Sequence, residues 1–188
     1  MKINAINLNF GKRLVATCCI KNKDKEKCPA SIYEYNPRNP EDAEEIKNSS
    51  YTNSIKRDFY RQYINCEIPA NKYYVLLDDK TKEVATVAKL SQHIAEDGKY
   101  KGYYISIDEL EENKNYIDSI TPMIGFIANK ANSIYSNNIL TAFRTYEMPA
   151  LKELKFKSTK EDIWALRSKG FNESILRAEK RNNLEIIQ

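Results

Sequence analysis

The sequence predicts an α/β protein with a mixed, mainly antiparallel central sheet that is flanked by helices. Two observations lead to this fold class. The chain contains both segments with a helical period of apolar residues and segments that alternate apolar and polar residues. The two kinds of segment are interspersed along the chain. Such an order is typical of a sheet that is covered by helices. The 188 residues contain no internal repeat. We therefore expect one domain over 1–188, in which 1–50 form an N-terminal hairpin and a short helix.

The N-terminal part predicts this hairpin and a short acidic helix. Residues 14–20 and 30–35 carry β-branched or aromatic side chains and are separated by a charged turn, which indicates two paired strands. Asn39 is a residue type that caps helix starts, and Pro40 fits the first helical position because its missing N–H would have no partner there. A helix over residues 40–47 is therefore expected.

A second helix and three strands follow. Three large side chains fall on one face of a helix predicted over residues 52–65: Ile55, Phe59 and Tyr63. Strand patterns then cover three segments: 73–78, 84–90 and 102–110. In the last segment, alternation puts Tyr103, Ile105 and Ile107 together on one buried or helix-covered face.

An acidic, asparagine-rich loop over residues 111–119 leads to a helix with an apolar stripe. Thr121 is its expected N-cap, and Pro122 lies in its first turn. Asn137 stops the helix, and the stretch 139–149 is compatible with either a strand or an irregular extension.

The C-terminal part predicts a strand, a short helix and a terminal hairpin. Residues 154–158 alternate apolar and lysine side chains, which indicates a strand. Residues 158–161 form a capping box that predicts a short helix ending at Gly170. Phe171 is expected to begin an extended segment that pairs with residues 184–187.

Composition disfavours several classes of protein. Hydrophobic residues make up 41% and charged residues 30% of the chain, which is typical of a globular domain. No window reaches the roughly 18 apolar residues of a membrane-spanning helix, and the N-terminus lacks a signal-peptide pattern, so a cytoplasmic protein is expected. Net charge is +4, and basic residues are interleaved with acidic ones, which makes nucleic acid an unexpected partner.

The cysteines and the histidine predict neither a metal site nor a disulfide framework. The four cysteines include no C-x-x-C pair: Cys18, Cys19, Cys28 and Cys66. The chain has one histidine, His93, so a zinc site would have too few ligands. We expect four free thiols and a surface position for His93.

Two parts of the sequence carry a resemblance to a known family. The strand patterns 74–78 and 83–88, followed by the strand 104–111, look like a central hairpin and a fourth strand. Residues 154–159 and 165–171 look like a fifth strand, a fourth helix and a closing Gly-Phe. In this order they resemble the GNAT superfamily of acyl-CoA-dependent N-acyltransferases, over most of the chain after residue 50. The resemblance implies a GNAT-like fold and acetyl-CoA as cofactor.

The resemblance also implies a site. In this family, backbone amides between the fourth strand and the third helix hold the pyrophosphate of acyl-CoA, because a helix start attracts anions. The cofactor-binding positions that correspond here are Leu110, Glu111, Ile120, Thr121, Met123, Ile124 and Gly125. Glu109 and Glu111, at the end of the fourth strand, are the candidate catalytic bases that would deprotonate an acceptor amine.

The sequence departs from the family's pattern within this site. The family's loop reads Gln/Arg-x-x-Gly-x-Gly/Ala, of which only Gly125 matches here. Met123 replaces the middle glycine, and Pro122 removes one N–H donor. Many members use a tyrosine of the fourth helix as general acid, and its place is taken by Leu166 or, in an alternative alignment that loses the glycine, by Leu151.

Three functions are consistent with these observations. The first is an N-acetyltransferase that transfers an acetyl group from acetyl-CoA to an amine of a small molecule or a protein. The second is a GNAT-shaped protein that has lost catalysis and binds a protein partner. The third is an unrelated α/β binding module that contacts RNA through its tyrosines and lysines. Acetyl-CoA binding at residues 120–125 separates the first two.

Overall fold

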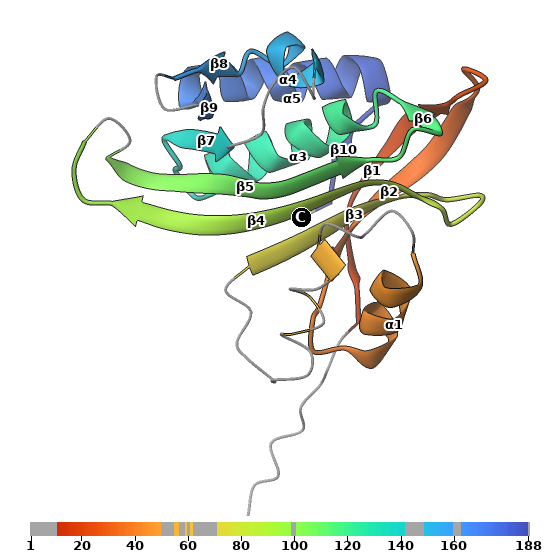
Figure 1. Ribbon diagram of the computed structural model, residues 1–188. Coiled ribbons are helices and arrows are strands. Elements are labelled where there is room, and N and C mark those ends of the chain that lie inside the picture. Colours follow the sequence, from red (N-terminus) through yellow and green to blue (C-terminus); the bar gives the residue numbers. More distant parts are fainter. Residues whose placement is uncertain are drawn as a thin grey trace, which may run out of the picture.

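A computed structural model describes residues 11–49, 55–56, 59, 61, 71–98, 101–141, 149–159 and 163–187. Its described strands form one ten-stranded sheet in the order β10-β1-β2-β3-β4-β5-β7-β9-β8, with β6 paired to β1. Helices α3, α4 and α5 cover one face of the sheet, and α1 lies on the other (Figure 1). All neighbouring strands pair antiparallel except β5 and β7, which run parallel. The expected mixed, mainly antiparallel sheet flanked by helices is confirmed.

The N-terminal hairpin and helix form as predicted. Strands β1 (Arg13–Asn22) and β2 (Lys27–Tyr35) pair antiparallel. Helix α1 (Pro40–Asn48) begins after Asn39, whose side chain accepts a hydrogen bond from the amide of Asp42. The cap therefore works as its residue type suggests.

The helix predicted over 52–65 lies mostly outside the described residues. Two of its three stripe residues, Ile55 and Phe59, are helical and fully buried. They pack in an apolar cluster with α1 and with strand β3 (Asn71–Asp78). Phe59 meets Tyr73 edge-on, with ring centroids 4.9 Å apart.

Strands β4 (Val84–Ala95) and β5 (Gly102–Glu112) run longer than predicted and contain an irregularity. Lys89 pairs with Glu109, and the next residue, Leu90, pairs with Ile107, so Asp108 is an extra residue on β5. A bulge of this kind shifts the side-chain alternation by one position. As a result Ile107 and Leu110 both join the core under α3.

One part of the β5 prediction is wrong. Ile105 and Ile107 are buried together, but the side chain of Tyr103 is 55% exposed. The parallel pairing of β5 with β7 (Asn138–Thr141) begins only at Tyr104. Tyr103 therefore lies beyond the part of β5 that is covered.

Helix α3 (Ile120–Ser133) connects β5 to β7 and packs on the sheet. It begins two residues earlier than expected, so Ser119 occupies the N-cap position and Thr121 lies within the first turn. A two-residue strand, β6 (Tyr116–Ile117), precedes it and pairs with β1. The ambiguous stretch after α3 contains β7, and residues 142–148 lie outside the described part.

The C-terminal predictions are wrong in most details. Helix α4 (Pro149–Glu153), which was not predicted, ends just before the predicted strand 154–158, and of that strand only β8 (Lys157–Ser158) forms. The predicted helix after the capping box is instead strand β9 (Trp164–Arg167), which pairs with both β7 and β8. Strand pairing on both sides and burial of its central residues outweigh the local helix signal.

The predicted terminal hairpin is replaced by a helix. A short 3-10 turn, η2 (Ser168–Gly170), leads into helix α5 (Phe171–Asn182). Gly170 thus precedes a helix rather than ending one. Strand β10 (Glu185–Ile186) then pairs with β1. The buried face of α5 is Phe171, Ser174, Ala178 and Asn182, and only one of these is a large apolar residue.

Candidate functional site

The start of α3 is the place where the family resemblance puts the cofactor. Its first peptide groups follow β5 by a seven-residue loop. The carboxylate of Glu112, the last residue of β5, accepts hydrogen bonds from the amide of Ser119 at 3.1 Å and from its hydroxyl at 2.9 Å. The amide of Ile120 also stabilises the charged form of this carboxylate. The carboxylate of Glu112 therefore accepts hydrogen bonds from the backbone N–H groups at the start of α3, where an anion is favoured.

Burial of Glu112 raises its pKa, although the hydrogen bonds from Ser119 and Ile120 oppose this rise. The negative charge of nearby Asp118 raises the pKa of Glu112 further. Two more hydrogen bonds hold the loop around these two carboxylates. Thr86 donates to the hydroxyl of Ser119 at 2.6 Å, and Thr121 donates its hydroxyl to Asp118. The start of α3 is thus a closed, internally hydrogen-bonded polar cluster.

Helix α5 covers the first half of α3. A Cβ atom added at Gly125 would lie 2.4 Å from Cβ of Ala178 and 3.0 Å from Cδ2 of Leu184. Glycine at this position therefore serves the close approach of two helices. Asn182 also donates from its side chain to the carbonyl of Cys19 at 3.0 Å, which holds the end of α5 against β1.

Two arginines of α5 connect the start of α3 to α4. Arg181 lies 3.9 Å from a carboxylate oxygen of Asp118 and 3.3 Å from one of Glu153. Arg177 donates to the carbonyl of Glu153 at 2.5 Å. These contacts hold α5 across the space between α3 and α4 on the helical face of the sheet.

The structure separates the predicted site residues onto two faces of the sheet. The cofactor-binding candidates on α3 are all buried under α5 and in the core: Ile120, Thr121, Met123, Ile124 and Gly125. Leu110 is buried in the same core. Glu109 and Glu111 are half-buried and pair with Lys89 and Val87. Because Val87 belongs to the cluster on the α1 side, the two glutamates lie on that opposite face.

The alternative alignment of the closing segment fits the observed elements better than the first one. Helix α4 follows the parallel strand β7, which is the position of a fourth helix after a fifth strand. Leu151, the residue in place of the general-acid tyrosine, is fully buried. Lys155, in the place of the glycine before Phe156, has φ of 69°, a conformation that favours glycine.

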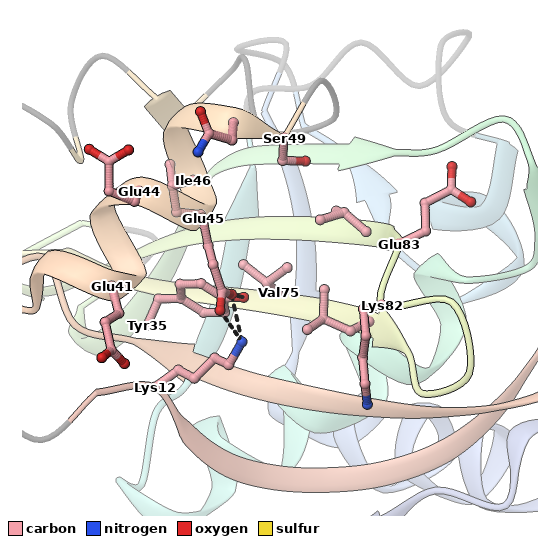
Figure 2. A pocket seen from close by; sticks show the side chains of 13 residues that line it. Lys12, Tyr35, Glu41, Glu44, Glu45, Ile46, Ser49, Val75, Lys82 and Glu83 are labelled. Atoms are coloured by element: carbon pink, nitrogen blue, oxygen red, sulfur yellow. Dashed lines mark hydrogen bonds and ion pairs between the residues drawn. The ribbon is translucent and has the colours of Figure 1, made fainter.

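A cavity of about 980 Å³ opens on the other face of the sheet, below α1 (Figure 2). Its walls are apolar where it meets the sheet, at Val75, Leu77 and Val84. Its rim carries charged residues: Lys12, Glu41, Glu44, Glu45, Lys82 and Glu83. No residue of β5 or β7 lines it. The cavity is therefore separate from the parallel strand pair.

Most charges of this rim already have partners within the chain. The ammonium group of Lys12 contacts both carboxylate oxygens of Glu45, at 2.6 and 2.5 Å, and Tyr35 donates its hydroxyl to the same carboxylate at 2.6 Å. Burial, and the hydrogen bond to Glu45, raise the pKa of Tyr35 far above its usual range. Glu83 accepts from the side chain of Asn113 at 3.1 Å. The cavity is thus an apolar-walled space whose rim carries more carboxylates than lysines, with Lys12 held by Glu45.

Sequence reasoning did not identify this cavity. Lys12 and Glu45 are 33 residues apart, and Tyr35 lies on a different element from both. No spacing rule joins them, because the hairpin and α1 bring them together only in the folded chain.

The remaining titratable residues form no reactive cluster within the described part of the chain. No group of His, Cys, Asp or Glu there could hold a metal ion. Cys18, Cys19 and Cys28 are free thiols, and Cys66 lies outside the described residues. His93 stacks on Tyr104 at an exposed position. None of the helices in the described ranges is long and apolar enough to span a membrane.

Comparison with known proteins gives matches in structure only. No family model and no curated protein sequence matches the chain. Among solved structures, a mutant AtaT toxin bound to the C-terminus of the antitoxin AtaR is similar with a TM-score of 0.54, at 11% identity, over 77% of this chain and 96% of that one. The same toxin bound also to acetyl-CoA gives 0.52, at 10% identity and the same coverage. FdhC, a nucleotide-linked sugar GNAT, gives 0.52 at 10% identity, over 86% and 95%.

Proposed function

We propose that this chain, whose fold is that of the GNAT acyltransferases, is a binding protein that has closed the acyl-CoA site with its own residues. The observation that carries the proposal is the start of α3. There the carboxylate of Glu112 accepts hydrogen bonds from Ser119, the residue just before the predicted pyrophosphate-binding positions, and from the amide of Ile120, the first of them. Helix α5 covers the same helix from outside, where Ala178 packs on Gly125.

Electrostatics support a closed site. A pyrophosphate at the start of α3 would meet two half-buried carboxylates, those of Glu112 and Asp118. Partial burial reduces the screening of the repulsion between like charges. The nearby cation Arg181 already pairs with Asp118 and with Glu153. The helix-start attraction for anions is already used by Glu112.

The cavity below α1 supports the binding part of the proposal. An entering group would gain by burying apolar surface against Val75, Leu77 and Val84, while the charged rim keeps its internal partners. Interfaces between proteins commonly depend on one large side chain that fills a pocket of this kind. We infer that a protein partner places an apolar side chain there.

The test of the closed site is a turnover measurement. The wild-type chain is incubated with acetyl-CoA and a panel of primary amines, and free CoA is quantified by chromatography. We expect no release of CoA above the spontaneous hydrolysis of acetyl-CoA. Release that depends on the amine and saturates with acetyl-CoA would overturn the proposal.

That outcome would establish the second candidate, an N-acetyltransferase that transfers an acetyl group from acetyl-CoA to an amine. The parallel arrangement of β5 and β7 around α3 and the similarity to a toxin structure that contains acetyl-CoA favour it. In that case Glu109 and Glu111, on the face opposite α3, are the candidate bases. Glu111→Gln would then lower the CoA release rate.

The cavity is tested with Nile red, a neutral dye that fluoresces in apolar surroundings. Glu44 lines the cavity, whereas Lys47, its ion-pair partner at 3.5 Å, does not. Glu44→Trp and Lys47→Trp therefore break the same ion pair, but only the first places an indole ring in the cavity. We expect Nile red fluorescence to fall in Glu44→Trp and not in Lys47→Trp. Equal fluorescence in both variants would contradict an accessible apolar cavity.

A further inference from the structure

A second cavity, of about 590 Å³, lies at the opposite end of the sheet from the β1–β2 hairpin, between α5 and the strands β8 and β9. Its apolar part is formed by Ala165 and Leu166, which are buried residues of β9. The hydroxyl-bearing residues Ser158 and Thr159 also line it. Its volume falls within the range of small-ligand sites, roughly 300–1,000 Å³.

Four cationic side chains converge on this cavity from different elements. Lys155 follows α4, Lys157 belongs to β8, Arg167 to β9 and Lys169 to η2. Against them stands one carboxylate among the described lining residues, that of Glu173, which lies 3.7 Å from the ammonium group of Lys155. Among the described lining residues, cations therefore outnumber carboxylates by four to one.

Three of these cations have no anionic partner in the described part of the chain. No carboxylate there lies within ion-pair distance of Lys157, Arg167 or Lys169. These exposed cations give the cavity a positive electrostatic potential, which attracts an anionic ligand.

We propose that the cavity between α5, β8 and β9 binds a small phosphate-bearing ligand of nucleotide size. Arginine matches phosphate oxygens with two parallel N–H bonds, and lysine supplies a compact positive charge. The apolar part at Ala165 and Leu166 offers a surface for the organic part of such a ligand. This site is distinct from the start of α3, so the inference does not depend on whether the acyl-CoA site is closed.

A cavity fits a small ligand better than a nucleic-acid strand. Proteins that bind single strands combine a long basic groove with exposed aromatic rings on which the bases stack. Among the described residues that line this cavity there is no aromatic side chain. The cations also surround one space instead of following a line across several strands.

The experiment is a calorimetric titration of the full chain with inorganic tripolyphosphate, ATP and a 12-nucleotide RNA at fixed salt. The test variant is Lys157→Glu/Lys169→Glu. The matched control is Lys23→Glu/Lys27→Glu, which makes the same change of charge at exposed residues of the β1–β2 hairpin. Circular dichroism verifies that both variants fold.

We expect the wild type to bind tripolyphosphate and ATP. The test variant should lose at least tenfold in affinity for both, and the control less than twofold, since distant charges are screened by salt. No binding to the wild type at millimolar ligand, or equal losses in both variants, would overturn the proposal. RNA binding that is tighter than ATP binding and weakened in the test variant would also overturn it, in favour of a nucleic-acid surface.

Discussion

Replacing Gly125 by alanine adds one methyl group where α3 crosses α5. The new Cβ would lie 2.4 Å from Cβ of Ala178, whereas carbon atoms in contact prefer about 3.5–4.0 Å. Cβ of Ala178 is bonded to the backbone and has no rotamer by which to move away. The helices must therefore separate.

The magnitude follows from two opposing terms. Glycine to alanine within a helix ordinarily stabilises by about 1 kcal/mol. Overpacking costs about 1–3 kcal/mol, and the fixed Ala178 favours the upper end. We expect Gly125→Ala to lower the free energy of unfolding by about 2 kcal/mol, which for a chain of this size lowers Tm by about 4–8 °C. Thermal unfolding followed by circular dichroism measures this shift.

A compensating variant distinguishes this clash from a general disturbance. Gly125→Ala/Ala178→Gly moves the methyl group from α5 to α3 and restores the separation between the helices. Its stability should lie within about 1 kcal/mol of the wild type, so that the two changes are strongly non-additive. Stabilisation by Gly125→Ala alone, or additive losses in the double variant, would refute the close approach of α5 to α3.

Three further predictions concern single positions. Burial raises the pKa of Glu112, so the stability linked to its proton is fully present below the unfolded value of 4.5 and is lost as pH rises through the folded pKa. Glu112→Gln should therefore gain in free energy of urea unfolding, relative to the wild type, between pH 4 and pH 7; a pH-independent difference would contradict this. Lys155→Gly should raise the free energy of unfolding by up to about 1 kcal/mol, because Lys155 has a positive φ. Lys152→Gly in α4 should instead lower it by about 1 kcal/mol. Losses of equal size in the two variants would argue against the left-handed conformation of Lys155. Burial raises the pKa of Cys18 to about 12 and also raises the pKa of Cys28. Because Cys18 is buried and Cys28 is only half-buried, iodoacetamide at pH 8 should modify Cys28 faster than Cys18. Equal rates by peptide mass spectrometry would contradict the burial of Cys18.

The sequence predicted the elements whose local signals agree with their packing. Strands β1 to β5 are rich in β-branched and aromatic residues, and α1 has both an N-cap and a proline at its start. Helix α3 has a broad apolar stripe that matches its burial. Where one face of an element is strongly apolar, periodicity identifies it.

The C-terminal region failed for the opposite reason. Helix α5 buries Ser174, Ala178 and Asn182, which are small or polar and give no apolar period. They are small because α5 lies close to α3, which cannot be known from the local sequence. Strand β9 carries a capping box before it, and only its pairing with β7 and β8 makes it a strand.

The packing around Gly125 could not be predicted for the same reason. The resemblance implies cofactor binding by Gly125, because it is the one residue here that matches the family's pyrophosphate loop. Its neighbours in space are Ala178 and Leu184, more than 50 residues later in the chain. With α5 predicted as an extended segment, nothing in the sequence indicated that Gly125 packs against a helix. The contact of Glu112 with Ser119 could not be predicted either, because Thr121 and not Ser119 was the expected N-cap.

The most direct test of the closed site observes the start of α3 itself. Amide resonances of the ¹⁵N-labelled chain are followed during a titration with acetyl-CoA. The closed site predicts that the amides of Ser119 and Ile120 keep their positions at millimolar acetyl-CoA. Shifts confined to Arg167 and Lys169 would report phosphate binding in the cavity beside α5 and leave the closed site intact. Saturating shifts at Ser119 and Ile120, accompanied by changes along α5, would contradict it and show that acetyl-CoA displaces the helix.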